Sequence, residues 1–413
     1  MHILLSAFAC SPTEGSESRA GWRVALELAK HHEVVVVTDE YRRAAIEAEL
    51  AHTPRDNPRF VFYRPTWLRS VPFRGQFSRL LYVGWQYSLL PFARRLHRQH
   101  RFDVVWHLTW GVFRHPSFLG FMGIPFVLGP IGGGEDAPLR LKRSIHGRDK
   151  LAENIRMALN YLAHVSPILW WAFSRADLIF TRTPHTARML PYGLGQRAIC
   201  AQEIGATPRA GVVAKQGTGG PLRVLYAGRL LALKGCHLAL RAVAAARRRG
   251  LDIRYTLVGS GPYEAELRRL SHELGDVAEF IPHVSQEQLF EIYRDMDCFL
   301  FPTLHDSGGT VTLEALSFAL PVICLDHCGP AEFVDASCGV VVPIANRDED
   351  GVAAGLADAL ALLAGDPQEF ARRSAGALLR ADHHRLENQV GRLVTQVELL
   401  VANKQGHIQL EEA

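Results

Sequence analysis

The chain has 413 residues, of which 48% are hydrophobic and 21% are charged, and its formal net charge is only +4. These values are typical of a soluble globular protein, and the small charge argues against a nucleic-acid partner. No uninterrupted apolar run approaches the roughly 20 residues that a membrane-spanning helix needs. The start, Met1 to Phe8, lacks the basic region of a secretion signal, and the seven cysteines are scattered. We therefore expect a cytoplasmic protein with reduced cysteines.

The first half of the chain alternates strand-like and helix-like segments. Short apolar runs, which are typical of buried strands, occupy Ile3–Ala7, Val34–Thr38, Phe60–Tyr63, Val104–His107, Phe126–Leu128 and Leu178–Phe180. Helical patterns lie between several of them, and the first runs from Arg19 to Lys30. Such alternation with short turns predicts a parallel sheet with helices on both faces.

The same alternation begins afresh at residue 222, after a stretch rich in Gly, Pro and small residues. Since a chain of this length usually divides into two domains, we predict an N-terminal domain at 1–205 and a linker at 206–221. A C-terminal domain at 222–380 and a helix and tail at 381–413 follow. The predicted fold class is α/β, with two Rossmann-like domains facing across a cleft, where ligands bind in such folds.

The most informative segment is 306–314, in which Asp306 is followed after seven residues by a second acid, Glu314. Between them lies the flexible run Ser307-Gly308-Gly309-Thr310, and a helical pattern begins at its end. A glycine turn that opens a helix can bind an anion, because the first N–H groups of a helix lack internal partners. Two carboxylates beside it can accept hydrogen bonds from sugar hydroxyls. The segment predicts a ligand with both phosphate and sugar.

Two further turns carry groups that suit phosphate. In the stretch 227–235, Arg229 and Lys234 flank a turn after a buried strand, and two such cations can neutralise a diphosphate; a solvated Arg and a helix-start Lys are the alternative. The first strand ends in a long turn containing Gly15, where backbone N–H groups could approach phosphate closely; an ordinary strand-to-helix turn is the alternative there. For the turn at 258–262 we favour a purely structural role.

These stretches together resemble the retaining glycosyltransferases of family 4, which have the two-Rossmann GT-B fold. The match rests on the turn near Gly15, AGRLLALKG at 227–235, VGSGP at 258–262 and the E-x7-E element at 306–314 with its following ALPVI. The resemblance implies a nucleotide-sugar donor held mainly by the C-terminal domain, without a metal or other cofactor. It also implies a final helix that crosses back to the first domain, which fits the amphipathic segment 384–403.

The resemblance also implies roles for individual residues. Arg229 and Lys234 would bind the diphosphate, and Glu314 would hydrogen-bond the ribose. Asp306 and the backbone of Gly308, Gly309 and Thr310 would contact the sugar and the phosphates. The family usually has Glu at the first acid, so Asp306, which is one methylene shorter, puts the identity of the sugar in doubt. In the first domain His107, at the end of a strand, is the candidate for the side chain that faces the sugar; a packing or capping histidine is the alternative.

Asp295 and Asp297 form a D-x-D pattern, but they fall between a helical run and a strand rather than on one open loop. We therefore predict no metal site there. Residues 57–102 contain nine Arg and no acid, with aromatic residues interleaved. This pattern suits an anionic membrane surface, such as the inner face of a cell membrane, or equally a solvated face over an ordinary core. We predict that the aromatic run 168–173 is a buried helix rather than a membrane contact.

The sequence thus predicts a retaining, metal-independent enzyme that moves a hexose from a UDP- or GDP-sugar to a glycolipid or polysaccharide hydroxyl, as in lipopolysaccharide biosynthesis. Two alternatives keep the fold. A nucleotide-sugar epimerase would need acid and base groups on both faces of the sugar, and a non-catalytic subunit would only support a partner. The intact set of Arg229, Lys234 and Glu314 weighs against both.

Overall fold

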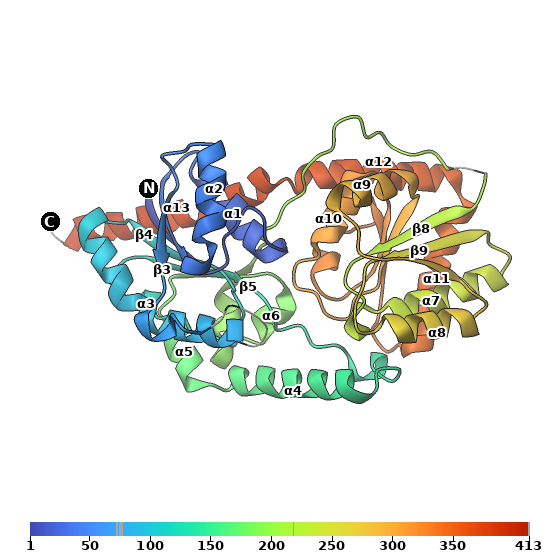
Figure 1. The fold of residues 1–413 in the computed structure, drawn as a ribbon, viewed down its shortest axis with the longest axis horizontal. Coiled ribbons are helices and arrows are strands. Elements are labelled where there is room, and N and C mark those ends of the chain that lie inside the picture. Colours follow the sequence, from blue (N-terminus) through green and yellow to red (C-terminus); the bar gives the residue numbers. More distant parts are fainter. Residues whose placement is uncertain (72, 74–76, 218, 412–413) are drawn as a thin grey trace. The chain divides into compact units, whose positions relative to one another are not determined.

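The computed structural model describes residues 1–71, 73, 77–217 and 219–411, without the side chains of 406–411. The chain forms two compact units (Figure 1). Unit 1 comprises Met1–Gly134, Ala158–Ile204 and Leu386–Ala413, and unit 2 comprises Glu135–Met157 and Gly205–Arg385. The helix α4 (Gly147–His164) contributes its first part to unit 2 and its last part to unit 1.

Unit 1 is built on a seven-stranded parallel sheet with the strand order β3-β2-β1-β4-β5-β6-β7. The strands are β1 (His2–Ala7), β2 (Glu33–Asp39), β3 (Arg59–Tyr63), β4 (Val104–Thr109), β5 (Phe126–Ile131), β6 (Leu178–Thr181) and β7 (Ala198–Cys200). Its α-helices are α1 (Ser16–Leu28), α2 (Arg43–His52), α3 (Phe77–His100), α5 (Pro167–Phe173), α6 (Pro184–Arg188) and α13 (Leu386–Glu411). Four 3-10 helices complete it: η1 (Glu40–Arg42), η2 (Thr66–Leu68), η3 (Leu119–Phe121) and η5 (Pro191–Arg197).

Both faces of this sheet are covered, which explains the nearly continuous apolar runs of its strands. Successive strand residues enter different cores: Val35 and Val37 pack with α3 and α5, whereas Val34 and Val36 pack with α1 and α13. Helix α13 buries a stripe on the second face that consists of Leu386, Val390, Leu393, Val397 and Val401. The prediction that the final helix crosses back to the first domain is therefore confirmed.

Unit 2 holds a six-stranded parallel sheet with the order β10-β9-β8-β11-β12-β13. The strands are β8 (Leu222–Ala227), β9 (Ile253–Val258), β10 (Ala278–Ile281), β11 (Cys298–Phe301), β12 (Val322–Leu325) and β13 (Gly339–Val342). Its α-helices are α7 (Cys236–Arg248), α8 (Glu264–Glu273), α9 (Gln286–Asp295), α10 (Thr310–Ser317), α11 (Glu349–Gly365) and α12 (Pro367–His383). Three 3-10 helices, η4 (Leu139–Leu141), η6 (Ala232–Lys234) and η7 (Gly329–Glu332), also belong to it.

The two sheets share one topology. In each, the first strand lies beside the fourth, and the strand order reverses between them: β1 beside β4 in unit 1, and β8 beside β11 in unit 2. At such a reversal the loops after the two strands diverge, and ligands of open parallel sheets bind in the crevice at that point. The predicted fold class of two Rossmann-like domains is confirmed.

Candidate functional site

The turn after β8 carries Arg229 and Lys234, and it is pressed against the chain that follows β11. Gly235 ends this turn in the left-handed conformation, with φ 70°, and precedes α7. A Cβ at Gly235 would lie 1.9 Å from the carbonyl oxygen of Pro302. The amide of Leu304 also donates to the carbonyl of Leu233, at 2.9 Å. Glycine is therefore required at 235, because only its backbone can approach the neighbouring turn so closely.

Lys234 and Asp306 form an ion pair at the reversal point of unit 2. The Lys234 Nζ lies 2.5 Å from Asp306 Oδ2 and 3.3 Å from the carbonyl oxygen of His305. Asp306 Oδ1 accepts hydrogen bonds from the amides of Gly308, at 3.1 Å, and Gly309, at 2.9 Å. The structure thus brings together four predicted site residues, and it uses the carboxylate of Asp306 to shape the glycine turn.

These contacts determine the charge state of Asp306, whose side chain is 22% exposed. Burial acts to raise the pKa of this carboxyl, but Lys234 and the two glycine amides lower it, and the pKa ends below its ordinary value. Asp306 is therefore ionised at neutral pH. Lysine has three N–H donors, so the contacts with Asp306 and His305 leave Lys234 one donor for a phosphate oxygen.

Arg229 and Glu314 lie on either side of this pair in the sequence. Arg229 is exposed, and its carbonyl accepts a hydrogen bond from the buried Tyr226 hydroxyl at 3.0 Å, which fixes the backbone of the turn. Thr310 is the first residue of α10, after Gly309 at φ 71°. Glu314 is half-buried in the same helix. Burial lowers the pKa of Arg209, and the negative charge of Glu314 acts in the opposite direction.

A segment before α4 joins this site, and the sequence analysis missed its role. Glu135, fully buried, accepts a hydrogen bond from the Ser307 hydroxyl at 2.6 Å, and its carbonyl oxygen lies 3.0 Å from Nδ1 of His305. Arg156 lies 3.3 Å from Asp136. Glu135 thus holds the residues on both sides of Asp306. No local pattern could have revealed this, because 172 positions separate Glu135 from Ser307.

The turn at 258–262 supports the turn after β8. A Cβ at Gly259 would lie 2.0 Å from the carbonyl oxygen of Gly228, and one at Gly261 would lie 2.2 Å from that of Leu230. The amide of Leu230 also donates to the carbonyl of Ser260 at 3.0 Å. These contacts agree with the structural role that we favoured for the turn.

In unit 1, Gly15 precedes α1 in the turn that follows β1. Its φ of −42° is open to any residue, and a Cβ there would have no heavy atom within 4 Å. The turn is held by other contacts: Glu17 accepts from the amide of Trp110 at 2.9 Å, and Glu14 pairs with the buried Arg42 at 3.2 Å. The fold itself therefore does not require glycine at 15. Close approach of a ligand to the backbone would be a reason for glycine at this position.

His107 lies inside unit 1, on β4. It is 2% exposed, with Nε2 3.3 Å from the Tyr82 hydroxyl and Nδ1 3.3 Å from Nε2 of Gln86. Burial lowers its pKa to about 4, so the ring is neutral at physiological pH. Beyond it, His115 is only half-buried, and its ring meets the Tyr82 ring edge-on, with the centroids 5.4 Å apart.

The D-x-D pattern is split between two elements, as expected. Asp295 ends α9, and the buried Asp297 precedes β11. Asp297 pairs with Arg223, at 2.8 Å between Oδ1 and Nη2, and it also accepts from the Arg223 amide. Over the described part of the chain, no group of three or more His, Cys, Asp or Glu side chains is arranged to hold a metal.

Residues 57–102 divide between core and surface. Tyr82 and Trp85 are buried, whereas Trp67, Phe77 and Tyr87 are exposed. Residues 72 and 74–76 in this stretch lie outside the described residues. Within the part of the chain that the structure describes, no helix is both long and apolar enough to cross a membrane.

The prediction of a buried helix at 168–173 is wrong for half of its residues. Leu169, Ala172 and Phe173 face the core, but Ile168, Trp170 and Trp171 are exposed. The run is amphipathic: its buried positions recur at helical spacing, and the two adjacent tryptophans fall on the other side.

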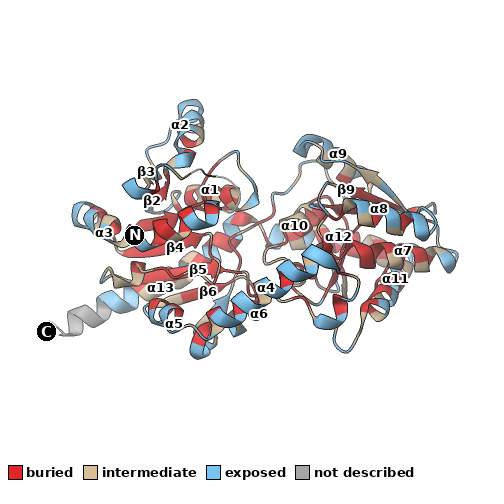
Figure 2. Cartoon of the chain, turned by 60° about the horizontal axis from the view of Figure 1, so that its bottom comes forward, coloured by how far each residue is buried: buried red, intermediate tan, exposed pale blue. Residues whose placement is uncertain are grey.

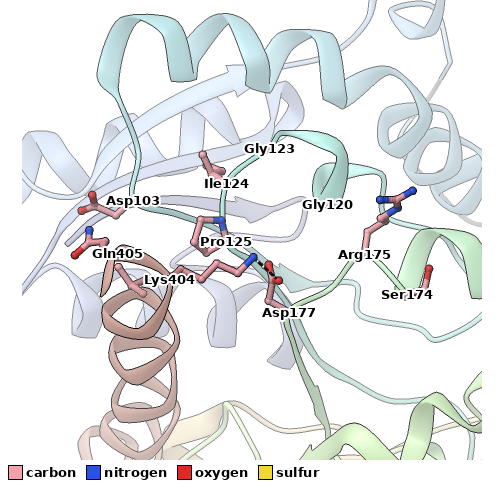
Figure 3. Close-up of a pocket in the computed structure, with 11 residues that line it drawn as sticks. Asp103, Gly120, Gly123, Ile124, Pro125, Ser174, Arg175, Asp177, Lys404 and Gln405 are labelled. Carbon is pink, nitrogen blue, oxygen red and sulfur yellow. Dashed lines mark ion pairs between the residues drawn. The ribbon is translucent and has the colours of Figure 1, made fainter. Parts of the chain in front are cut away.

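A pocket of about 650 Å³ lies in unit 1. Asp103, Pro125 and Asp177, which line it, directly precede β4, β5 and β6, so it opens at the amino ends of the strands (Figure 3). Lys404 of α13 reaches across to Asp177, at 2.6 Å. The candidate turns lie at the opposite, carboxyl edge of their sheets.

Part of the chain is similar to known proteins. Residues 213–373 match the family model described as glycosyl transferases group 1, which covers the turn after β8 and the whole 306–314 element. The putative colanic acid biosynthesis glycosyltransferase WcaL of Salmonella typhimurium is 30% identical over 213 residues, 48% of this chain and 51% of that protein. The D-inositol 3-phosphate glycosyltransferase of Nocardia farcinica is 30% identical over 257 residues, 60% of this chain and 53% of that protein. The chain spans about half the length of the curated relatives it matches.

Among solved structures, Anabaena HepE in complex with UDP superposes with a TM-score of 0.60 at 14% identity, over 96% of this chain and 100% of that one. A likeness at this identity concerns the fold alone. The chain therefore has the two-domain GT-B fold of solved glycosyltransferases, and residues 213–373 of its second unit match the group 1 glycosyl transferase model.

Proposed function

We propose that the protein is a glycosyltransferase that moves a hexose from a UDP- or GDP-sugar to a hydroxyl of a glycolipid or polysaccharide. The observation that carries the proposal is the cluster of Lys234, Asp306 and the glycine turn at the strand reversal of unit 2. Its place in the sheet is where nucleotide ligands of such folds bind. The match of this region to the group 1 model supports the same reaction class.

In this proposal the cations act on the leaving group. When the bond from the sugar to the diphosphate breaks, negative charge develops on the departing oxygen, and preorganised positive groups stabilise it. Lys234 is held in place by Asp306, and in the proposal the exposed Arg229 binds the other phosphate. Glu314 would take the ribose hydroxyls. We propose that the reaction retains the anomeric configuration and needs no metal, because these side chains supply the positive charge.

The donor and the acceptor are proposed by analogy with similar proteins. HepE was solved with UDP, which supports a uridine donor, and the name of WcaL refers to colanic acid biosynthesis, which supports a polysaccharide acceptor. We keep Gly15 and His107 as candidate residues of unit 1. The burial of His107 makes it a candidate for positioning Tyr82 and its neighbours rather than for a direct contact with the sugar.

The test is calorimetric binding of UDP, GDP and ADP in the presence of EDTA. We expect one diphosphate to bind, and Arg229→Ala to weaken it at least tenfold, since a charged contact to phosphate is lost. Arg254→Ala is the matched control, because Arg254 is an exposed arginine of the same unit on β9. Equal binding by the two variants would contradict the site, and binding that EDTA abolishes would contradict metal independence.

Incubation with the nucleotide sugar identifies the reaction. A transferase releases the nucleoside diphosphate and yields a glycoside, whose anomeric configuration can be read from its NMR coupling constant. Retention of the donor's configuration supports the proposal, and inversion contradicts the mechanism. An epimerised nucleotide sugar would instead identify an epimerase, and binding without turnover of any acceptor class would favour a non-catalytic subunit.

A further inference from the structure

Large hydrophobic side chains gather on the outside of unit 1, along the end of α4 and along α5. We call this surface the α4–α5 face and define it by Leu159, Leu162, Val165, Ile168, Trp170 and Trp171. All six are exposed, from 41% at Val165 to 61% at Leu162, and Figure 2 shows both helices mostly in the colour of exposed residues. Single exposed hydrophobic residues are ordinary, but a contiguous group marks an interaction surface.

Contacts join the α4–α5 face to its surroundings into one surface. The hydroxyl of the exposed Tyr192 donates to the carbonyl of Val165 at 2.8 Å, and its ring lies edge-on to that of Trp170, with the centroids 6.3 Å apart. On the other side, Trp171 meets the ring of Phe121 at 4.4 Å. Phe118 links Trp171, at 6.1 Å, to the exposed Tyr87 of α3, at 5.1 Å. The surface therefore extends from η5 across α5 to α3.

The charge around this surface is positive. In residues 158–202 the only acid is Asp177, and it is paired with Lys404 at 2.6 Å. Figure 3 shows Lys404 reaching Asp177 while Arg175 points away from that pair. Three exposed arginines, Arg94, Arg175 and Arg197, border the surface. None of the three forms an ion pair with a carboxylate among the described residues.

The basic side chains are also attached to the aromatic residues. The Arg94 guanidinium donates to the carbonyl of Phe121 at 2.6 Å, and that of Arg175 lies 5.3 Å from the centre of the Phe121 ring. Arg197 donates to the carbonyl of Ala176 at 2.7 Å. The carbonyl groups and the Phe121 ring in these contacts carry no charge, so they do not neutralise the arginines. The arginines can therefore attract an anionic surface beside the α4–α5 face.

We propose that the α4–α5 face docks unit 1 on an anionic lipid bilayer. Trp and Tyr favour the boundary between lipid headgroups and acyl chains, because one side of each ring is apolar and one end is polar. Helices of this kind lie in the interface with their apolar side immersed, and arginines beside it attract anionic headgroups. A second copy of this chain is the competing occupant, and the test separates the two.

The α4–α5 face is a different part of unit 1 from the stretch 57–102, for which the sequence suggested a membrane contact. The pattern of 57–102 drew attention to α3, but Tyr82 and Trp85 of that helix belong to the core. Only its exposed residues, such as Tyr87, border the surface. The docking surface does not depend on the proposed transferase reaction, since none of its residues lies in the turns of the candidate donor site.

The test is flotation of the whole protein with vesicles of phosphatidylcholine alone or of phosphatidylcholine mixed with the anionic lipid phosphatidylglycerol. We expect the wild type to float with the anionic vesicles, and less so as salt is raised. Ile168→Glu should reduce the bound fraction at least tenfold. It places an acid in the first turn of α5, where the helix dipole favours it, so the fold should be preserved. Leu379→Glu, at an exposed leucine of α12 in unit 2, is the matched control.

Equal flotation by the Ile168→Glu and Leu379→Glu variants would overturn the proposal, as would a wild type that ignores anionic vesicles. Analytical ultracentrifugation without lipid covers the competing occupant. If the wild type is an oligomer that Ile168→Glu converts to a monomer, the α4–α5 face is a protein interface and the lipid proposal fails. Binding of UDP, measured on the same variants, should be unchanged. A failure of the proposed donor site can then be distinguished from a failure of the proposed membrane contact.

Discussion

The junction of the two turns in unit 2 leads to a prediction about Gly235→Ala. Gly235 has φ 70°, and an added Cβ would lie 1.9 Å from the carbonyl oxygen of Pro302. Pro302 directly follows β11 and leads to Asp306, so a displacement there moves the partner of Lys234. The substitution should therefore reduce both the stability of unit 2 and its affinity for a nucleoside diphosphate.

Two contributions set the size of the effect. An alanine in the left-handed region costs about 1–2 kcal/mol. Relief of the contact requires the two turns to separate by about 1 Å, and such overpacking typically costs about 1–3 kcal/mol. Gly250→Ala isolates the first contribution, because Gly250 has φ 87° and open space around its Cβ position. The expected loss in free energy of unfolding is about 2–5 kcal/mol at 235 and about 1–2 kcal/mol at 250.

Urea unfolding followed by circular dichroism measures the difference, and calorimetry with UDP measures the functional effect. At 235 we expect a lower urea midpoint and at least tenfold weaker binding, whereas at 250 binding should remain at the wild-type level. If the two variants lose the same stability, the close approach of the turns is not what requires glycine. If Gly235→Ala binds UDP normally, the turn after β8 does not position the donor.

Three further predictions concern Asp306 and Gly15. The lowered pKa of Asp306 means that its carboxylate stabilises the fold above its unfolded pKa, near 3.8, and that this advantage is lost as the pH falls through the lower folded value. The difference in unfolding free energy between the wild type and Asp306→Asn, about 1–3 kcal/mol at pH 7, should thus shrink in titrations below pH 4; a constant difference would contradict the ion pair. Asp306→Glu should lower the urea midpoint and change the preference between UDP-sugars, because its longer side chain cannot accept the same two amides; an unchanged preference in competition assays would remove Asp306 from sugar recognition. Gly15→Ala should leave the melting temperature within about 2 °C but reduce transfer at least tenfold, and full activity would show that no ligand approaches Gly15.

The sequence predicted the central strands well because they are buried on both faces. A run such as Val34 to Val37 contributes alternate residues to two cores, so every position must be apolar, and the pattern is unmistakable. The edge strands β7, β10 and β13 were not predicted. They are three or four residues long and partly exposed, so neither length nor hydrophobicity distinguishes them from loops.

The candidate site was predictable only where its residues share a turn. Asp306 and the two glycines lie within four positions, and their grouping could be read directly. The contact between Lys234 and Asp306 spans 72 positions and was not predicted. The resemblance to a family implied only that both residues belong to the donor site. Glu135 had no such signal, because its role depends on a segment of the chain that leaves unit 1 and packs in unit 2. The exposure of Trp170 and Trp171 was hidden for a related reason: adjacent bulky residues suggest a core until the helix phase is known.

Asp306 is one methylene shorter than the Glu that the family usually has at the first acid, and its contacts indicate a structural role for this side chain. A carboxylate that accepts two amides of its own turn and a lysine has little capacity left for the hydroxyls of a sugar. Its main effect is then to hold the glycine turn closed and to fix Lys234 beside it. The buried Glu135, through Ser307, holds the same turn from the other side. With both acids engaged in this way, recognition of the sugar would fall to other groups that the turn positions, while the third donor of Lys234 remains for phosphate. Substitutions at Asp306 should therefore act on the choice of sugar through the shape of the turn rather than through a direct contact of this carboxylate.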